Sequence, residues 1–248
     1  MTRRQMLGLL GAAAAQGVRA QSALKFRGLD HIEFTVADVE KSTAFYAQLF
    51  GGADVMKNRT TTRRYIKLGS SYMAIDRADT PRIDHACLGI ENFDIAAVHA
   101  YLTSQGLMYR DYPSGRDTGV NDSDGTRLQL SSADGWTSLA AQTASPEPRE
   151  LKEARLFQPL LLTNVQVNVS DMAKATAHYE RLAGKTSYIG LRQATMGGYE
   201  RFTVRVAPFD ATVSTRLMAL GARIEKAERT GIQFIDPDGF RVAITTLE

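Results

Sequence analysis

The chain has 248 residues, of which 44% are hydrophobic and 23% charged, a composition typical of a globular protein with one or two domains. The formal net charge is only +3, and no basic run or aromatic-interleaved basic patch is present, which argues against nucleic-acid binding. The single cysteine, Cys87, excludes an internal disulfide.

Residues 1–20 have the pattern of an export signal. Paired arginines at 3–4 precede a run rich in Leu, Gly and Ala over 7–15, and short residues at 18 and 20 fit cleavage before Gln21. The pattern resembles a twin-arginine signal, and an ordinary secretory signal or an uncleaved anchor are the alternatives. We therefore expect an exported, periplasmic protein. No later segment reaches the roughly 20 apolar residues that a membrane span needs.

The next segment predicts a first β-α-β-β-β unit. LDHIEFTV at 29–36 alternates with period two, which places His31 and Glu33 on one strand face. Asp38 is a suitable N-cap for a helix over 39–49, which the glycine pair at 51–52 ends. A strand hairpin is predicted over 65–76.

A second unit follows directly, and its last strand comes after a DSDG turn. Asp and Gly are favoured at these turn positions. Its predicted elements are a strand at 83–90, a helix at 93–105 and strands at 108–112, 119–121 and 126–131.

Residues 133–158 contain Gly, Ser, Pro and charged residues, and we interpret them as a linker with a helical turn around 150–156. Another set of alternating and helical patterns follows. Its predicted elements are strands at 165–169, 202–206, 231–235 and 240–245 and helices at 172–182, capped by Ser170 or Asp171, and 211–220.

The two halves share sequence features in the same order. LDHIEFTV, AFY and DSDG in the first half correspond to LLTNVQVNV, AHY and DPDG in the second, so that His31 corresponds to Asn164. The second copy is shorter between its first helix and its last turn. We expect the lost residues to belong to the strands equivalent to 65–76 or to their loops. Tyr46 and Tyr179 are equivalent, and we interpret both as packing residues.

These openings and the DSDG and DPDG closings resemble the vicinal oxygen chelate superfamily, which includes glyoxalase I, extradiol dioxygenases, fosfomycin-resistance enzymes and bleomycin-binding proteins. The resemblance covers residues 28–248. It implies an α+β fold with two paired βαβββ modules, at 28–132 and 159–248, whose mixed sheets curl into a cup.

The resemblance also implies a divalent metal in the first module. The family's ligand positions fall on His31, His85 and Gln129, where Gln129 replaces the usual Glu. A further family ligand position falls near Ala74, which cannot bind metal. Imidazole and amide donors are compatible with Fe, Zn, Mn or Ni, and the sequence leaves the metal open.

Three other side chains near these positions have open roles. Glu33 lies on the face of His31 and is either a fourth ligand or the general base. Cys87 stands in the same relation to His85, and either lines the site or is a small buried residue. His99 and His178 are interpreted as ordinary helix residues. Tyr65, Tyr72, Tyr109, Tyr112 and Arg64 are candidate pocket residues.

The second copy carries no equivalent ligand set, because Asn164 and Ala243 stand at the positions of His31 and Gln129, and we assign it a structural role. The leading hypothesis is an exported metal-dependent enzyme that acts on a small oxygen-bearing molecule, by dioxygenase-, lyase- or isomerase-like chemistry. The alternative is a non-catalytic periplasmic small-molecule binding protein of the same fold.

Overall fold

The computed structural model describes residues 24–210 and 212–246. The export signal expected at 1–20 therefore lies outside the described residues. Within the described part of the chain, no helix is both long and apolar enough to cross a membrane.

The first sheet takes its strands from residues 26–146 in the order β6-β7-β8-β5-β1-β4-β3-β2-β9. Strand β1 lies near the middle, with β4 parallel on one side and β5 antiparallel on the other. The strands are β1 (Phe26–Val36), β2 (Val55–Asn58), β3 (Arg64–Leu68), β4 (Ser71–Arg77), β5 (Arg82–Ile90), β6 (Tyr109–Asp111), β7 (Asp117–Asn121), β8 (Arg127–Ser132) and β9 (Ala144–Pro146).

The second sheet has the order β11-β10-β12-β15-β14-β13. Its strand β10 likewise lies between a parallel neighbour, β11, and an antiparallel neighbour, β12. The strands are β10 (Pro159–Val169), β11 (Ile189–Gln193), β12 (Gly198–Val206), β13 (Arg223–Glu228), β14 (Gly231–Ile235) and β15 (Arg241–Thr246).

The second sheet is smaller because the connection between its first helix and the next strand is short. Residues 184–188 lead from α4 (Met172–Ala183) directly to β11, where the first sheet has β2 and β3 before β4. The shortening thus removes two strands and keeps the one parallel to the opening strand.

In the described part of the chain five helices flank the sheets, so the α+β class is confirmed, with two open mixed sheets. Asp38 caps α1 by accepting a 3.0 Å hydrogen bond from the backbone N–H of Lys41, and Asp171 caps α4 in the same way. The remaining helices are α2 (Ile95–Ser104), α3 (Gly135–Gln142) and α5 (Val213–Ala219), and α1 spans Val39–Phe50.

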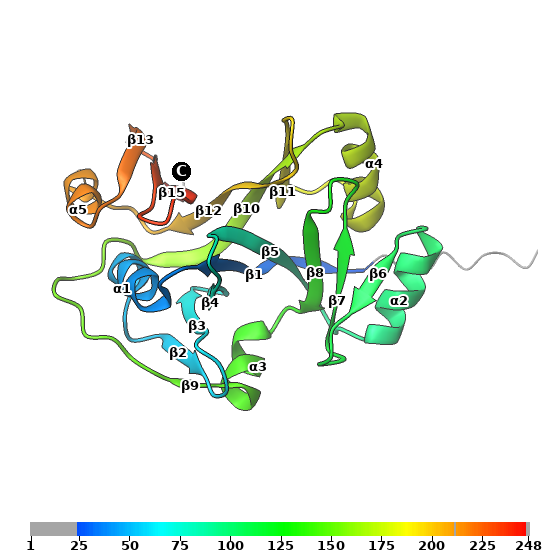
Figure 1. The fold of residues 1–248 in the computed structure, drawn as a ribbon, viewed down its shortest axis with the longest axis horizontal. Helices are drawn as coiled ribbons and strands as arrows, with labels where there is room; N and C mark the ends of the chain where they lie inside the picture. The colour runs from blue at the N-terminus through cyan, green and yellow to red at the C-terminus, as the bar shows by residue number, and fades with distance from the viewer. Residues whose placement is uncertain (1–23, 211, 247–248) are drawn as a thin grey trace, which may run out of the picture.

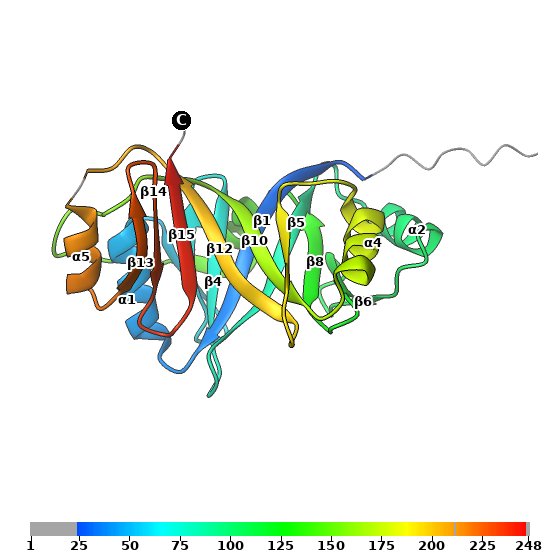
Figure 2. The same cartoon turned by 90° about the horizontal axis from the view of Figure 1, so that it is seen from above.

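The two sheets pack over one apolar core. The Phe34 ring of β1 lies 5.4 Å from the Phe202 ring of β12, and both side chains are fully buried. In both views α1 and α5 lie at one end of the molecule, and α2 and α4 at the other (Figures 1 and 2). Because Phe34 faces the core, its neighbours His31 and Glu33 point to the opposite face of the first sheet.

The segment 133–158 differs from the expectation in its local structure. Its helix is α3 at Gly135–Gln142, and residues 150–156 are not helical. The backbone N–H of Phe157 donates to the carbonyl of Leu49 at 2.8 Å, and that of Leu156 to Gln48. These bonds serve carbonyl groups at the end of α1 and hold the end of the segment extended.

Candidate functional site

A cavity of about 550 Å³ opens on the face of the first sheet that points away from the core. Side chains from neighbouring strands line it, together with residues of α3. Its lining includes His31, Glu33, Tyr72, His85, Asp117 and Gln129.

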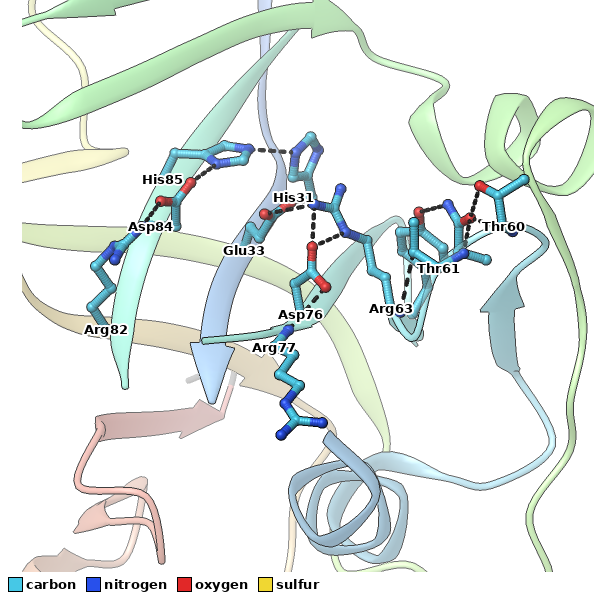
Figure 3. Close-up of polar contacts among 12 residues, drawn as sticks. His31, Glu33, Thr60, Thr61, Arg63, Asp76, Arg77, Arg82, Asp84 and His85 are labelled. Atoms are coloured by element: carbon cyan, nitrogen blue, oxygen red, sulfur yellow. Dashed lines mark hydrogen bonds and ion pairs between the residues drawn. The ribbon is translucent and has the colours of Figure 1, made fainter. Parts of the chain in front are cut away.

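Two histidines from adjacent antiparallel strands meet in this cavity. His31 Nε2 on β1 lies 3.3 Å from His85 Nε2 on β5, and the rings meet edge to face (Figure 3). Both residues are buried, with 7% and 5% of their surface exposed. The sequence-predicted pair is therefore brought together with its ring nitrogens facing one another.

A carboxylate holds the other ring nitrogen of each histidine. Asp30 Oδ2 lies 2.8 Å from His31 Nδ1, and Asp84 Oδ2 lies 3.0 Å from His85 Nδ1. The register of β1 against β5 has an irregularity at each aspartate. Leu29 pairs with Leu88 and His31 with Cys87, so Asp30 has no partner. His85 pairs with Glu33 and Ile83 with Phe34, so Asp84 has no partner. These β-bulges let an aspartate reach the histidine that follows it.

The tautomers follow from these contacts. An N–H group on Nδ1 that donates to the carboxylate leaves the lone pair on Nε2 free, and we assign this tautomer to both rings. Arg127 Nη2 also lies 2.8 Å from His85 Nδ1, but both groups would be donors, so we assign its bond to Asp84, with which it pairs. Burial lowers the pKa of His85 below 6.5, which keeps the ring neutral at neutral pH.

Gln129 on β8 completes this wall of the cavity. Its strand runs parallel to β5, with Gln129 beside Cys87 in the register. The Gln129 amide oxygen is buried and has no hydrogen-bond partner among the described residues. A buried acceptor without a partner carries a desolvation cost that a bound ligand would relieve.

Glu33 lies beside His85 but is already engaged. A carboxylate oxygen of Glu33, a carboxylate oxygen of Asp84 and a ring nitrogen of His85 lie within 4.8 Å of one another. Arg63 Nη2 donates to Glu33 Oε1 at 3.0 Å and to Asp76 Oδ2 at 2.6 Å, and so bridges the two carboxylates (Figure 3). The ion pair with Arg63 therefore fixes the position of the Glu33 carboxylate.

Solved structures with the same fold are enzymes of two kinds. A Mn(II)-bound glyoxalase from Novosphingobium aromaticivorans aligns with a TM-score of 0.67 at 16% identity, over 90% of this chain and 83% of that one. The homoprotocatechuate 2,3-dioxygenase of Arthrobacter globiformis aligns with a TM-score of 0.65 at 14% identity, over 90% and 80%. No family model matches the sequence.

The chain has the vicinal oxygen chelate fold. Proteins with this fold include the halotolerant catechol dioxygenase BphC, which aligns with a TM-score of 0.66 at 12% identity over 90% of this chain and 87% of that one. At these identities the likeness establishes the architecture, and the chemistry of this chain has to be argued from its own side chains.

The donor set of this vicinal oxygen chelate fold fits a divalent metal. The two Nε2 atoms lie 3.3 Å apart, close enough for both to bind one ion. The carboxylates on both Nδ1 atoms are the partners that metal-bound histidines usually have. His31, His85 and Gln129 could therefore hold the ion.

The second module has different side chains at the corresponding places. Asn164 donates to the backbone carbonyl of Ser187, and Ala243 pairs with Thr203 at the register of Gln129. The position of His85 is taken by Arg201, whose guanidinium donates to Gln166 and Gln233. An arginine held by two amides replaces the histidine pair, so these residues do not form a second metal site.

The remaining candidates divide between two places. Tyr65, Tyr72 and Tyr112 line the cavity, and the Tyr72 ring stacks on His31 with centroids 4.6 Å apart. Tyr109 instead stacks on His99, which bonds Asp111 on the surface. Arg64 pairs with Glu40 and Glu147, His178 lies against Tyr179, and Cys87 is fully buried.

Sequence reasoning missed several residues of the cavity, among them the charged residues Arg63, Arg116, Asp117 and Arg127. Arg63 lies in the loop before β3, and Asp117 begins β7, a short strand whose expected start was residue 119. The available signal for Arg127 was its place two residues after the DSDG turn and two residues before Gln129.

Proposed function

We propose that this protein is an exported metal-dependent enzyme that acts on a small oxygen-bearing molecule. The observation that carries the proposal is the pair of buried Nε2 atoms of His31 and His85, 3.3 Å apart, with a carboxylate on each Nδ1. Two buried imidazoles with free lone pairs directed at one point are costly unless they share a proton or a metal.

In this proposal His31, His85 and Gln129 are the metal ligands. Fe, Zn, Mn and Ni all accept such donors. A metal bound there would hold a substrate through adjacent oxygens and stabilise the negative charge that develops on them. The amide of Gln129 adds no charge, and Glu33 supplies the missing negative charge beside His85, where its ion pair with Arg63 orients it.

The surrounding side chains would bind and orient the substrate. Tyr72 packs on the His31 ring and limits its rotation. Helix α3 contributes Ser138 and Leu139 to the lining of the same cavity. The chemistry we propose is dioxygenase-, lyase- or isomerase-like, in keeping with a metal that polarises two neighbouring oxygens.

The test is metal analysis of protein purified without chelator and without a metal-binding tag. We expect close to one equivalent of a transition metal, lost in His31→Ala and in His85→Ala. His99→Ala is the matched control, because His99 lies on α2 and bonds Asp111 away from the cavity. Less than about a tenth of an equivalent in the wild type would reject the metalloenzyme and favour a metal-free small-molecule binding protein.

A further inference from the structure

The outer face of the second sheet carries an arginine at its centre. Arg201 on β12 pairs in the strand register with Gln166 on β10 and with Arg241 on β15. The next residue, Phe202, is fully buried in the core between the sheets, so Arg201 points to the opposite face. Figure 2 looks onto this face of the second sheet, with α4 and α5 at its two ends.

Two neutral amides hold the Arg201 guanidinium in place. Its Nη1 donates to Gln233 Oε1 at 3.1 Å, and its Nη2 donates to Gln166 Oε1 at 2.9 Å. Gln233 belongs to β14, which is separated from β12 by β15. The residue of β15 beside Gln233 is Ala243, whose small side chain leaves room for the arginine to reach across. The guanidinium therefore extends across the sheet at this point.

The surroundings of Arg201 are rich in hydrogen-bond donors. A guanidinium has only donors, so the amide oxygens of Gln166 and Gln233 must face it, and we assign both amides accordingly. Each amide then presents its NH2 group as a further donor on the same face. Thr203, two residues along β12, adds a hydroxyl to this face. The acceptor atoms of the two glutamines are thus used by the arginine, and donors remain.

The acidic side chains nearby are engaged by other arginines. Glu200, the residue before Arg201, pairs with Arg192 at 2.7 Å and with Arg241 at 2.8 Å. Glu225 pairs with Arg241 at 3.2 Å. Across residues 24–210 and 212–246, no carboxylate forms an ion pair with Arg201. Its positive charge is therefore balanced only by amide dipoles.

The position of Arg201 makes this imbalance costly. The side chain is half-buried, and its Nε is buried without a hydrogen-bond partner among the described residues. Arg205, four residues farther along the same face of β12, likewise has no carboxylate partner in the described part of the chain. A partly desolvated cation without a counter-ion is unfavourable, and an anion that bonds to it would offset this cost.

We propose that this face of the second module binds a small oxyanion, a carboxylate or a phosphate group, through Arg201 and the NH2 groups of Gln166 and Gln233. The planar fork of an arginine matches the oxygen spacing of both groups. The site lies on the other sheet from the histidine pair and is independent of the proposed metal-dependent function. The second module, expected from its sequence to be structural, thereby has a binding role of its own.

The test is a nuclear magnetic resonance titration of the isotope-labelled full chain with acetate and, separately, with inorganic phosphate at constant ionic strength. We expect the side-chain NH2 signals of Gln166 and Gln233 to shift and to saturate with at least one anion, which identifies the group that binds. Arg201→Gln should weaken this binding at least about tenfold. Arg77→Gln is the matched control, because it removes an exposed arginine at the end of β4 in the first sheet.

Arg201→Lys is a second variant that keeps the charge and loses the planar fork. It should bind the anion more weakly than the wild type, and it replaces Arg201→Gln if that variant does not fold. His31→Ala should bind the anion as the wild type does, since it changes only the first sheet. Its loss of metal without loss of anion binding would separate this site from the metal cavity.

Three results would overturn the proposal. The first is the absence of saturable shifts with either anion. The second is equal binding by the wild type and the Arg201 variants, or binding that is lost in His31→Ala instead. The third is a dimer that forms in the wild type and not in Arg201→Gln, because this face would then hold a second copy of the chain. Absence of metal in the wild type would reject the proposed function and leave the anion site standing.

Discussion

The Tyr46 hydroxyl donates a 2.5 Å hydrogen bond to Asp236 Oδ2, which joins helix α1 of the first half to the DPDG turn of the second. Tyr179 in α4 makes the corresponding 2.9 Å bond to Asp122 in the DSDG turn of the first half. Equivalent tyrosines, one from each half, therefore form hydrogen bonds to equivalent aspartates of the other half. Both tyrosines pack as expected, but each also carries a hydrogen bond between the halves.

Removal of the Tyr46 hydroxyl should destabilise the protein. Tyr46→Phe leaves a buried carboxylate oxygen without its donor, and we expect a loss of about 1–3 kcal/mol in the free energy of unfolding. The measurement is a urea titration, with Tyr109→Phe as the control, since Tyr109 is 38% exposed. An equal effect of the two substitutions would show that the Asp236 bond contributes nothing specific.

Asp236 should make stability depend on pH. Burial raises the pKa of Asp236 from 3.8 to about 6 in the folded protein. The folded state thus binds this proton more tightly, so the contribution to stability is full below 3.8 and is lost as the pH rises through about 6. Its size is about 3 kcal/mol at about 1.4 kcal/mol per pKa unit.

Asp236→Asn isolates this contribution. The unfolding free energies of wild type and variant are measured at several pH values between about 4 and about 8. The two should diverge as the pH rises. The wild type should lose stability relative to the variant over that range. Parallel profiles would contradict the raised pKa of Asp236.

Gly135 should be required for the position of His31. The backbone N–H of Gly135 donates to Asp30 Oδ1 at 3.1 Å, and a β-carbon at this residue would meet Asp30 Oδ2 at 2.2 Å. Gly135→Ala must displace Asp30, which holds His31 Nδ1. We expect metal affinity to fall about 10–100-fold, the usual effect of losing such a partner.

Competition of the protein with a metal-binding dye measures this change. Thr137→Ala is the matched control, because Thr137 is exposed on the same helix. Asp30→Asn should reproduce the loss seen in Gly135→Ala. A glycine variant with wild-type affinity would show that α3 does not position the histidine.

Cys87 should be unreactive in the folded protein. Its side chain is fully buried, and burial raises the pKa of the thiol well above 9.0, which suppresses the thiolate. We expect a thiol reagent such as a disulfide dye to label it only when urea unfolds the chain. Labelling in native buffer at the rate of the unfolded chain would mean that the first sheet opens readily at β5.

The elements with strong patterns were predictable from the sequence, and the weak ones were not. Alternation and an aspartate cap were sufficient for β1 and α1, because a half-buried strand and a capped helix leave clear periodicities. The edge strand β13, with the sequence RIEKAE, is almost fully exposed and shows no such alternation. Strand β9 is three residues long and includes Pro146, so nothing local marks it as a strand.

The same division applies to the site. His31, His85 and Gln129 were inferred from a resemblance in the strand openings and in the DSDG closing, and the structure brings all three to one cavity. Whether they bind metal stays a prediction. Arg63 and Asp117 could not be inferred, because their relevance depends on which strands lie side by side.

By itself the sequence determined the α+β class and the asymmetry between the halves, since periodicity and the exchange of His31 for Asn164 are local properties of the chain. Only the tertiary structure decided which charged side chains of the cavity form ion pairs. Arg63 engages Glu33, while Asp117 has no ion pair among the described residues. Ion pairs in a folded sheet join residues far apart in the chain, and their energies depend on separations of a few ångströms that packing alone sets.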